Sequence, residues 1–331
     1  MSAKTIRIGD VARLAGVSTA TVSRSLSNPE MVSEKTREAV AAAIAQTGYR
    51  PNEAARNLRQ SRTGGIVALV PDLSNPFFAK ILSGIASVLG PAGYNLLIAD
   101  TRAGDPARLA HHVDPSRADG VINLDGSLPA QMLRGPLPVV DACEWVPDLD
   151  APRVRIDNQK AMELVVDHLA DLGHSRIAFG AGPRENVLSV TRFAGYHSAM
   201  AARGLPLCPT YEGDFSVQSG EEIAKIWAGE PAASRPSAIC FVSDAMACGF
   251  IAELTRRGLR VPQAVSVVGF DDIELTSLIS PPLTTIQQPR TRLGESAARR
   301  LLAEIKGKGG EKDRMLEVKL LIRGSTAPPA P

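Results

Sequence analysis

The amino-acid sequence predicts an N-terminal all-α domain followed by an α/β body of two lobes with parallel sheets. Three observations support this prediction. The chain has 331 residues, which is more than one ordinary domain needs. Its first sixty residues carry short helical patterns, and from Gly65 on apolar, strand-like runs alternate with helices. The alternation occurs twice, which indicates two similar lobes.

The first two predicted helices are joined by a very short turn. Apolar residues between Ile8 and Ala15 recur at helical spacing. Gly16 supplies the backbone freedom that a tight corner needs, and Ser18 can cap the start of the next helix. Helices joined so tightly predict a helix-turn-helix motif, whose second helix reads the major groove of DNA. The alternative is a small helical module that binds another protein.

Two more helices are predicted before the body begins. A turn at 28–30 leads to a third helix, for which Ser33 is the expected N-cap and Gly48 the expected end. A short helix is predicted for 51–58, and 61–65 form a linker. Because so short a helix is marginal alone in water, it needs a partner, either another copy of itself or DNA.

The body begins with short apolar strands of the kind that are buried in parallel sheets. The predicted strands are 66–70, 94–98, 118–124 and 138–140 in the first set, and 177–180, 238–241 and 265–270 in the second. Helices are predicted from 77 to about Gly93 and from 191 towards Gly204. Two such sets form two lobes with a cleft between them, and ligands bind such folds at the carboxyl ends of the strands. Between Thr101 and Ala118, Pro106 and Pro115 leave little room for a long helix.

Charge is distributed unevenly along the chain. Residues 1–63 hold ten Lys or Arg against five Asp or Glu, a balance of +5, so the rest of the chain carries −3 of the total +2. A basic first domain fits contact with phosphates, although chance surface charge remains the alternative. No apolar run reaches the roughly 20 residues of a membrane helix, and the N-terminus lacks the apolar core of an export signal. The four scattered cysteines are typical of reduced thiols in a cytosolic protein.

Three segments resemble the LacI/GalR family of bacterial transcription regulators: Ile8–Arg24, Tyr49–Asn52 and Pro281–Pro289. The resemblance covers nearly the whole chain. It implies a helix-turn-helix domain and a periplasmic-binding-protein-like body whose lobes exchange strands, with crossovers near Asp157, near Ile286 and Gln287, and near Leu320. The implied domains are 1–50, the helix-turn-helix domain; 51–63, the hinge helix and linker; 64–157 with 287–320, the N-terminal lobe; and 158–286 with 321–331, the C-terminal lobe.

The same resemblance implies a set of DNA-binding residues. The expected base contacts are Thr19, Ala20 and Arg24, and arginine can address two acceptors of guanine at once. Leu58 is the expected wedge in the minor groove, unless it is an ordinary packing leucine. The residues expected to hold phosphates are Ser18, Thr21, Ser23 and Asn52.

Candidate effector-binding residues follow the ends of predicted strands or lie on helices beside them. They are Asp72, Asn75, Phe77, Arg192, Phe215, Ser243 and Asp271, with Ser74 and Asp272 as neighbours. The resemblance implies that Arg192 and Asp271 bind the effector, facing each other across the cleft so that they fork onto sugar hydroxyls or a carboxylate. For each polar residue the alternative is a surface pair or a helix cap. Ser243 stands where many relatives have Asn, and Asp244 is expected to cap the following helix rather than touch the ligand.

The sequence gives little support for an enzymatic function. The five histidines show no metal-ligand spacing, and no nucleophile elbow, phosphate loop or dinucleotide fingerprint is present. His174 falls at a helix-to-strand turn and is expected to be structural. No catalytic residue, metal or cofactor is therefore predicted. A solute-binding protein would share the body, but it would need an export signal and would not need residues 1–60.

The sequence thus predicts a ligand-responsive repressor of transcription in the cytoplasm, with no membrane contact. We expect a homodimer on a near-palindromic double-stranded DNA operator, because two symmetric readers require a symmetric site. The expected effector is a small sugar, sugar phosphate or polyol in the cleft. Whether this effector releases or recruits DNA is left open.

Overall fold

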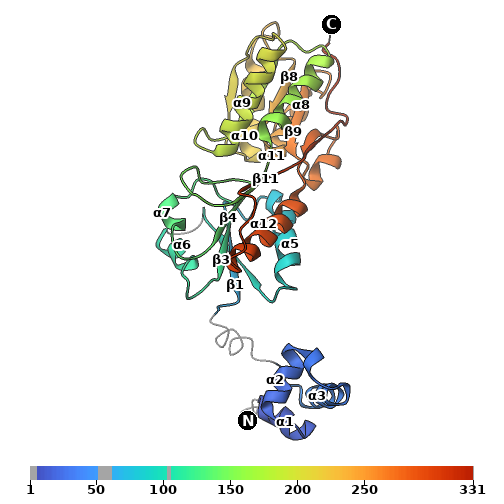
Figure 1. Ribbon diagram of the computed structural model, residues 1–331. Coiled ribbons are helices and arrows are strands. Elements are labelled where there is room, and N and C mark those ends of the chain that lie inside the picture. Colours follow the sequence, from blue (N-terminus) through green and yellow to red (C-terminus); the bar gives the residue numbers. More distant parts are fainter. Residues whose placement is uncertain (1–5, 51–61, 103–105, 331) are drawn as a thin grey trace. The chain divides into compact units, whose positions relative to one another are not determined.

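The computed structural model describes residues 6–50, 62–102 and 106–330. The chain divides into two compact units, Met1–Arg62 and Thr63–Pro331 (Figure 1). Asn52 and Leu58, the two predicted DNA-binding residues of the hinge helix, lie outside the described residues.

The described part of the first unit, residues 6–50, contains three α-helices around a small apolar core. They are α1 (Ile8–Ala15), α2 (Thr19–Ser27) and α3 (Glu34–Thr47), with a 3-10 turn, η1 (Pro29–Met31), between the last two. The buried side chains of Val11, Val22 and Val40 form the centre of this core, one from each helix. Val11 lies on the apolar face that helical spacing predicts for 8–15, whereas Val22 was not predicted as part of the core.

Local signals fix where these helices begin and end. Gly16 adopts a φ of 66° at the end of α1, and the Ser18 hydroxyl accepts a hydrogen bond of 3.1 Å from the Thr21 amide at the start of α2. Gly48 ends α3 with a φ of 65°. Ser33 is the N-cap residue of α3, as predicted, but its hydroxyl pairs with the Thr36 hydroxyl at 2.9 Å and accepts from no backbone N–H.

The first lobe of the second unit holds a six-stranded sheet in which every neighbouring pair is parallel. In spatial order its strands are β11 (Asp313–Leu316), β5 (Arg153–Ile156), β4 (Val139–Ala142), β3 (Gly120–Asn123), β1 (Gly65–Val70) and β2 (Asn95–Asp100). Figure 1 shows α5 (Phe77–Leu89) and α12 (Arg290–Ile305) side by side on one face of this sheet, with α6 (Pro106–His112) and α7 (Ala130–Leu133) on the other. The short α6 agrees with the limited room predicted between Thr101 and Ala118.

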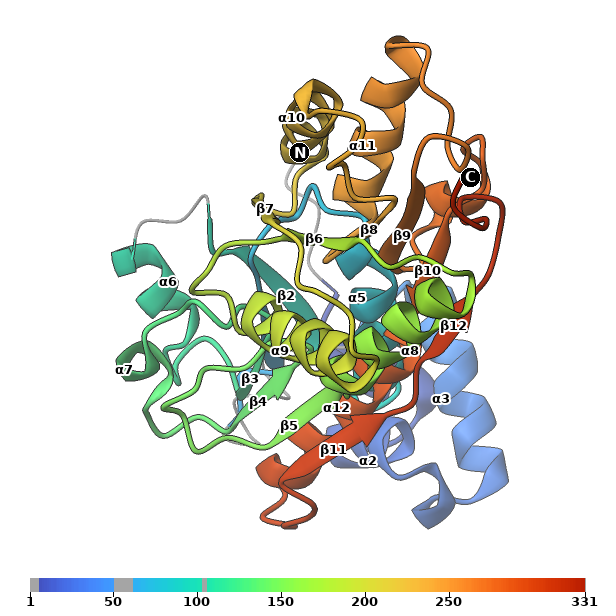
Figure 2. The same ribbon diagram turned by 90° about the horizontal axis from the view of Figure 1, so that it is seen from above.

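The second lobe holds another six-stranded sheet, parallel except at one edge. Its strands in spatial order are β12 (Lys319–Leu321), β10 (Thr284–Gln287), β9 (Ser266–Asp271), β8 (Ala238–Phe241), β6 (Ile177–Ala181) and β7 (Thr210–Glu212). Its helices pack in two pairs, visible in Figure 2: α8 (Asn158–Asp171) with α9 (Val187–Ala202), and α10 (Val217–Gly229) with α11 (Asp244–Arg256). A 3-10 turn, η2 (Glu274–Ser277), follows β9.

Glycines set the distance between helices in both lobes. A Cβ atom on Gly84 of α5 would lie 2.2 Å from the Thr291 carbonyl oxygen of α12, and one on Gly294 would lie 2.0 Å from the Ile81 oxygen. The α10–α11 pair repeats the arrangement, since a Cβ atom on Gly249 would lie 2.0 Å from the Val217 oxygen. These contacts bring each helix backbone against its neighbour, where any larger residue would force the pair apart.

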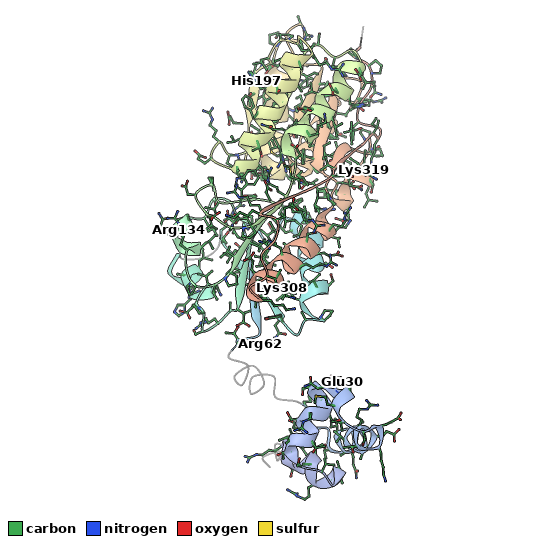
Figure 3. All side chains as sticks on the ribbon, in the orientation of Figure 1. Glu30, Arg62, Arg134, His197, Lys308 and Lys319 are labelled. Atoms are coloured by element: carbon green, nitrogen blue, oxygen red, sulfur yellow. The ribbon has the colours of Figure 1, made fainter. Side chains whose placement is uncertain are left out.

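The chain crosses between the lobes three times. The crossings fall after β5, after β10 and between β11 and β12, where Lys319 is labelled in Figure 3. The predicted boundaries assigned Gln287, Lys319 and Leu320 to the N-terminal lobe, but all three pair within the second sheet. Strand pairing across distant parts of the chain decides such a boundary, and strands of three or four residues carry little local pattern. None of the helices in the described ranges is long and apolar enough to cross a membrane.

Candidate functional site

A cavity of about 540 Å³ lies between the two lobes of the second unit. Its walls come from residues that follow the carboxyl ends of strands in both sheets, together with the start of α9. Parallel strands end at one edge of a sheet, so residues far apart in sequence meet there. The structure brings all seven predicted effector residues to this cavity: Asp72, Asn75, Phe77, Arg192, Phe215, Ser243 and Asp271.

Asp72, Asn75 and Phe77 form part of the first-lobe wall. The Asp72 carboxylate accepts hydrogen bonds from the Ser74 hydroxyl at 2.6 Å and from Arg102 at 3.1 Å. The Ser74 hydroxyl is the main reason that the pKa of Asp72 lies below its usual value. Asn75 accepts from the Phe77 amide at 3.0 Å, which fixes the loop that enters α5. This wall therefore presents a charged carboxylate beside an aromatic ring.

Arg192 is buried in the second-lobe wall, with 2% of its surface exposed. Its guanidinium carbon lies 3.7 Å from the centre of the Phe270 ring. It donates to Asn158 Oδ1 at 2.9 Å and to the Val242 carbonyl oxygen at 2.5 Å. Among the described residues, its buried Nη2 atom has no hydrogen-bond partner. A buried donor in this state is expected to bond a ligand or a water molecule.

Arg192 and Asp271 lie on the same wall, which corrects the prediction that they face each other across the cleft. Arg192 Nη1 is 4.0 Å from Asp271 Oδ1, and α9 and β9 both belong to the second lobe. Burial raises the pKa of Asp271, and the charge of Arg192 opposes that shift. Gln288 donates to Asp271 Oδ1 at 2.7 Å. Asp272 Oδ1 accepts a hydrogen bond of 2.6 Å from Arg323, and Asp272 does not line the cavity.

Ser243, and not Asp244 as we expected, caps α11, whereas Asp244 does not line the cavity, in agreement with the prediction. The Ser243 hydroxyl accepts from the Met246 amide at 3.3 Å and so caps α11, although Ser243 also lines the cavity. Asp244 caps nothing. It is fully buried and accepts from the Ile273 amide at 2.9 Å and the Thr285 hydroxyl at 2.6 Å. Both partners come from segments distant in sequence, so local spacing alone did not reveal them.

Phe215 reaches the cavity through an unusual backbone conformation, with a φ of 70°. Its ring covers Gly182, where a Cβ atom would lie 2.7 Å from Phe215 Cζ. The glycine thus leaves the space that the aromatic ring fills.

Sequence reasoning missed several polar residues of the cavity, among them Asp125, Glu144 and Asn186. Asp125 follows β3 and Glu144 follows β4, so the strand-end rule applied to Asp72 and Asp271 also fits them. Asn186 caps α9 in the second lobe and donates across the cleft to Glu144 Oε2 at 3.0 Å. Burial raises the pKa of Glu144 to about 7.

The predicted DNA-binding residues of the first unit lie on or beside α2. Thr19, Ala20 and Arg24 are exposed, whereas Val22 of the same helix is buried. The remaining described candidates are Ser18, Thr21 and Ser23. Ser18 and Thr21 share a hydrogen bond of 2.9 Å between their hydroxyls, so both are engaged in the helix start. One side of α2 thus forms the core while the other is free to meet a partner.

His174 is structural, as expected. Its ring nitrogens lie 2.9 Å from the Ser237 hydroxyl and 2.9 Å from the Ala327 carbonyl oxygen, which ties the C-terminal segment to the second lobe. The four cysteines are free thiols, and burial raises the pKa of Cys143, Cys240 and Cys248. Within the described parts of the chain, no group of three or more His, Cys, Asp or Glu side chains is arranged to hold a metal ion.

A helix-turn-helix unit joined to a two-lobed body with a polar cleft defines a ligand-responsive regulator of transcription. Comparison with known proteins agrees. Residues 7–52 match the family model of bacterial regulatory proteins of the lacI family, and residues 166–326 match a periplasmic binding protein-like domain. The chain belongs to the lacI family.

Relatives match over almost the full chain. The HTH-type transcriptional repressor CytR of Escherichia coli is 38% identical over 327 residues, which are 96% of this chain and 95% of the relative. The ribose operon repressor of Escherichia coli is 35% identical, over 96% of this chain and 98% of the relative. A crystal structure of the lac repressor dimer bound to operator and the anti-inducer ONPF matches with a TM-score of 0.86 and 30% identity, over 98% of this chain and all of that one. These relatives are repressors of transcription and not enzymes.

Proposed function

We propose that this chain represses transcription as a homodimer on a near-palindromic DNA operator, and that a small sugar-like effector in the cleft alters its affinity for DNA. The observation that carries the proposal is the union of an exposed reading face on α2 with a polar cavity between two lobes. The match to an operator-bound dimeric repressor over nearly the whole chain supports it. Two copies of one reader require two related half-sites.

We assign the DNA contacts by chemistry and exposure. Thr19, Ala20 and Arg24 read base edges, since they share the exposed face of α2. Ser18, Thr21 and Ser23 hold phosphates near the start of the same helix. Asn52 and Leu58 complete the proposal outside the described residues, as a phosphate contact and a minor-groove wedge.

We assign effector binding to the seven residues that meet in the cavity. The polar members are Asp72, Asn75, Arg192, Ser243 and Asp271, and Phe77 and Phe215 supply aromatic faces. Carboxylates and a guanidinium beside aromatic rings are suited to a sugar, whose hydroxyls need partners and whose ring carbons need an apolar surface. The name of the ribose operon repressor supports the same class of effector.

The effector acts by changing the relation between the lobes. It binds residues of both walls, so it stabilises one arrangement of the lobes over another and shifts the population between two states. This mechanism allows either release or recruitment of DNA. We also propose that the protein acts in the cytoplasm, where free buried thiols remain reduced.

The DNA-binding assignment is tested by gel-shift titration of Arg24→Ala on an operator selected from random near-palindromic DNA. Loss of a bidentate guanine contact costs about 1–3 kcal/mol, so affinity at matched salt should fall by roughly fivefold or more. Arg13→Ala is the matched control, because Arg13 is exposed on α1 and pairs with Asp10. Equal losses in the two variants, or none in Arg24→Ala, would contradict the assignment.

The cleft assignment is tested by thermal-shift screening of the full chain against sugars, sugar phosphates and polyols. Calorimetry with the best hit should then show binding at least tenfold weaker for Asp271→Ala, because a buried hydrogen-bonding group of the cavity wall is lost. Unchanged affinity would refute the role of Asp271.

A further inference from the structure

The cleft is strongly acidic. Among the residues that the structure describes, eight charged side chains line it: Asp72, Arg102, Asp125, Glu144, Glu185, Arg192, Asp214 and Asp271. Six carboxylates against two guanidinium groups give the wall a formal charge of −4. A concave wall of one sign focuses its field inside the cavity and repels ligands of the same sign.

Both arginines already have partners within the protein. Arg102 pairs with Asp72 at 3.1 Å. Arg192 lies 4.0 Å from Asp271 and donates to Asn158 and to the Val242 carbonyl. Its unpartnered Nη2 needs only an acceptor, which a neutral hydroxyl oxygen supplies. The charge of Arg102 is therefore compensated, whereas that of Arg192 is compensated only while Asp271 is ionised, and in either case carboxylates outnumber arginines on the wall.

Protonation of the buried carboxylates does not reverse the sign of the charge on the cavity wall. Burial raises the pKa of Glu144 to about 7 and also raises that of Asp271. Even with both of these groups neutral, the four other carboxylates outnumber the two arginines. Asp72 is held in its charged form, since the Ser74 hydroxyl keeps the pKa of Asp72 low.

Glu144 offers the open acceptor among the buried carboxylates of the first-lobe wall. Its Oε2 atom accepts from the Gly126 amide and from Asn186, each at 3.0 Å, and no described residue donates to Oε1. Asp125, by contrast, uses both of its oxygens, one for Ser127 and the other for Thr101. Glu144 is only 7% exposed and lines the cavity, so its second oxygen is a preformed site for a hydrogen-bond donor on a ligand.

We propose that the cleft selects its effector by charge. It takes a neutral or positively charged polyhydroxylated molecule, such as a sugar or an amino sugar, that places an O–H or N–H donor on Glu144, and it rejects phosphorylated and carboxylated sugars. This inference rests on the proposed function of the cleft and narrows its ligand class, since it excludes the sugar phosphates that the sequence left open.

The test uses matched sets of probes and the full-length protein. Glucose, galactose and mannose are each compared with their 2-amino and 6-phosphate derivatives, and ribose with ribose 5-phosphate, by thermal shift and then calorimetry. Within any set that binds, the neutral or amino member should bind at least tenfold tighter than the phosphate. A phosphate that binds as tightly as its neutral parent would overturn charge selection but leave a sugar effector in place. Binding by no member of any set would overturn both.

The variant Glu144→Gln tests whether Glu144 binds the effector. Glutamine keeps the size of the side chain but removes the charge, so an amino sugar that binds should lose on the order of tenfold in affinity, and its neutral parent less. Glu163→Gln is the control for net charge, because Glu163 pairs with Lys160 on α8, away from the cavity. Equal affinities of Glu144→Gln and wild-type protein for the amino sugar would overturn the assignment.

Discussion

Replacing Asn186 with alanine is expected to destabilise the two-lobed body through two separate losses. Asn186 Oδ1 accepts from the Leu188 amide at 2.8 Å and from the Ser189 amide at 3.3 Å, which caps α9. Its Nδ2 atom donates across the cleft to Glu144 at 3.0 Å. The same side chain thus serves a helix and the contact between lobes.

The two losses have different magnitudes. An N-cap replaced by alanine costs about 1 kcal/mol. A hydrogen bond to a charged acceptor contributes about 1.5–3 kcal/mol. Asn186→Ala should therefore lower the free energy of unfolding by about 3 kcal/mol at pH 8, where Glu144 is mostly ionised because its pKa is about 7. Ser216→Ala, which removes only the cap of α10, should cost about 1 kcal/mol.

A double-mutant cycle separates the two terms. Urea unfolding of wild type, Asn186→Ala, Glu144→Ala and the double variant is followed by tryptophan fluorescence. If the cross-lobe bond stabilises the body, Asn186→Ala should cost only about 1 kcal/mol in the Glu144→Ala background. The coupling should also shrink at pH 6, where protonated Glu144 is a weaker acceptor. The same cost for Asn186→Ala in both backgrounds at pH 8 would refute the reasoning.

Three further predictions concern packing, titration and capping. Gly249→Ala should lower the free energy of unfolding by about 1–3 kcal/mol, since its Cβ atom would lie 2.0 Å from the Val217 oxygen. The control Gly9→Ala should not, because its Cβ atom would have nothing within 4 Å. A denaturation midpoint of Gly249→Ala equal to that of the wild type would contradict this prediction. Burial raises the pKa of Asp141 to about 6, so the contribution of Asp141 to the stability of the fold is complete below pH 3.8 and is lost as the pH rises through 6. Asp141→Asn should therefore flatten the pH dependence of the free energy of unfolding between pH 4 and 7 by up to about 3 kcal/mol. An unchanged slope would count against this prediction. Ser18→Ala should lower the melting temperature of the first unit in calorimetry, because the cap on the Thr21 amide is worth about 1 kcal/mol; an unaltered transition would show that this cap contributes nothing.

Local signals determined the elements that the sequence predicted well. Gly16, Ser18 and Gly48 act within one helical turn of their own positions, so their effects can be read from neighbouring residues. The apolar strands of the sheets were also predicted, because burial on both faces leaves a continuous apolar run. The strands β5, β7, β10, β11 and β12 were not predicted, since their three or four residues mix polar and apolar side chains and form no continuous apolar run.

The sequence alone also determined that seven of the predicted residues gather at the cavity, because a parallel sheet places every strand end at the same edge. Only the tertiary structure decided what those residues do there. Asp244 bonds Ile273 and Thr285, Arg192 shares a wall with Asp271, and Glu144 meets Asn186 from the other lobe. Each of these partners lies at least 29 positions away along the chain. The contacts of Asp244 and Arg192 form only when the second lobe has folded, and the bond of Glu144 forms only where the two lobes meet. The acidic character of the cleft arises in the same way, from scattered carboxylates that sequence spacing does not bring together.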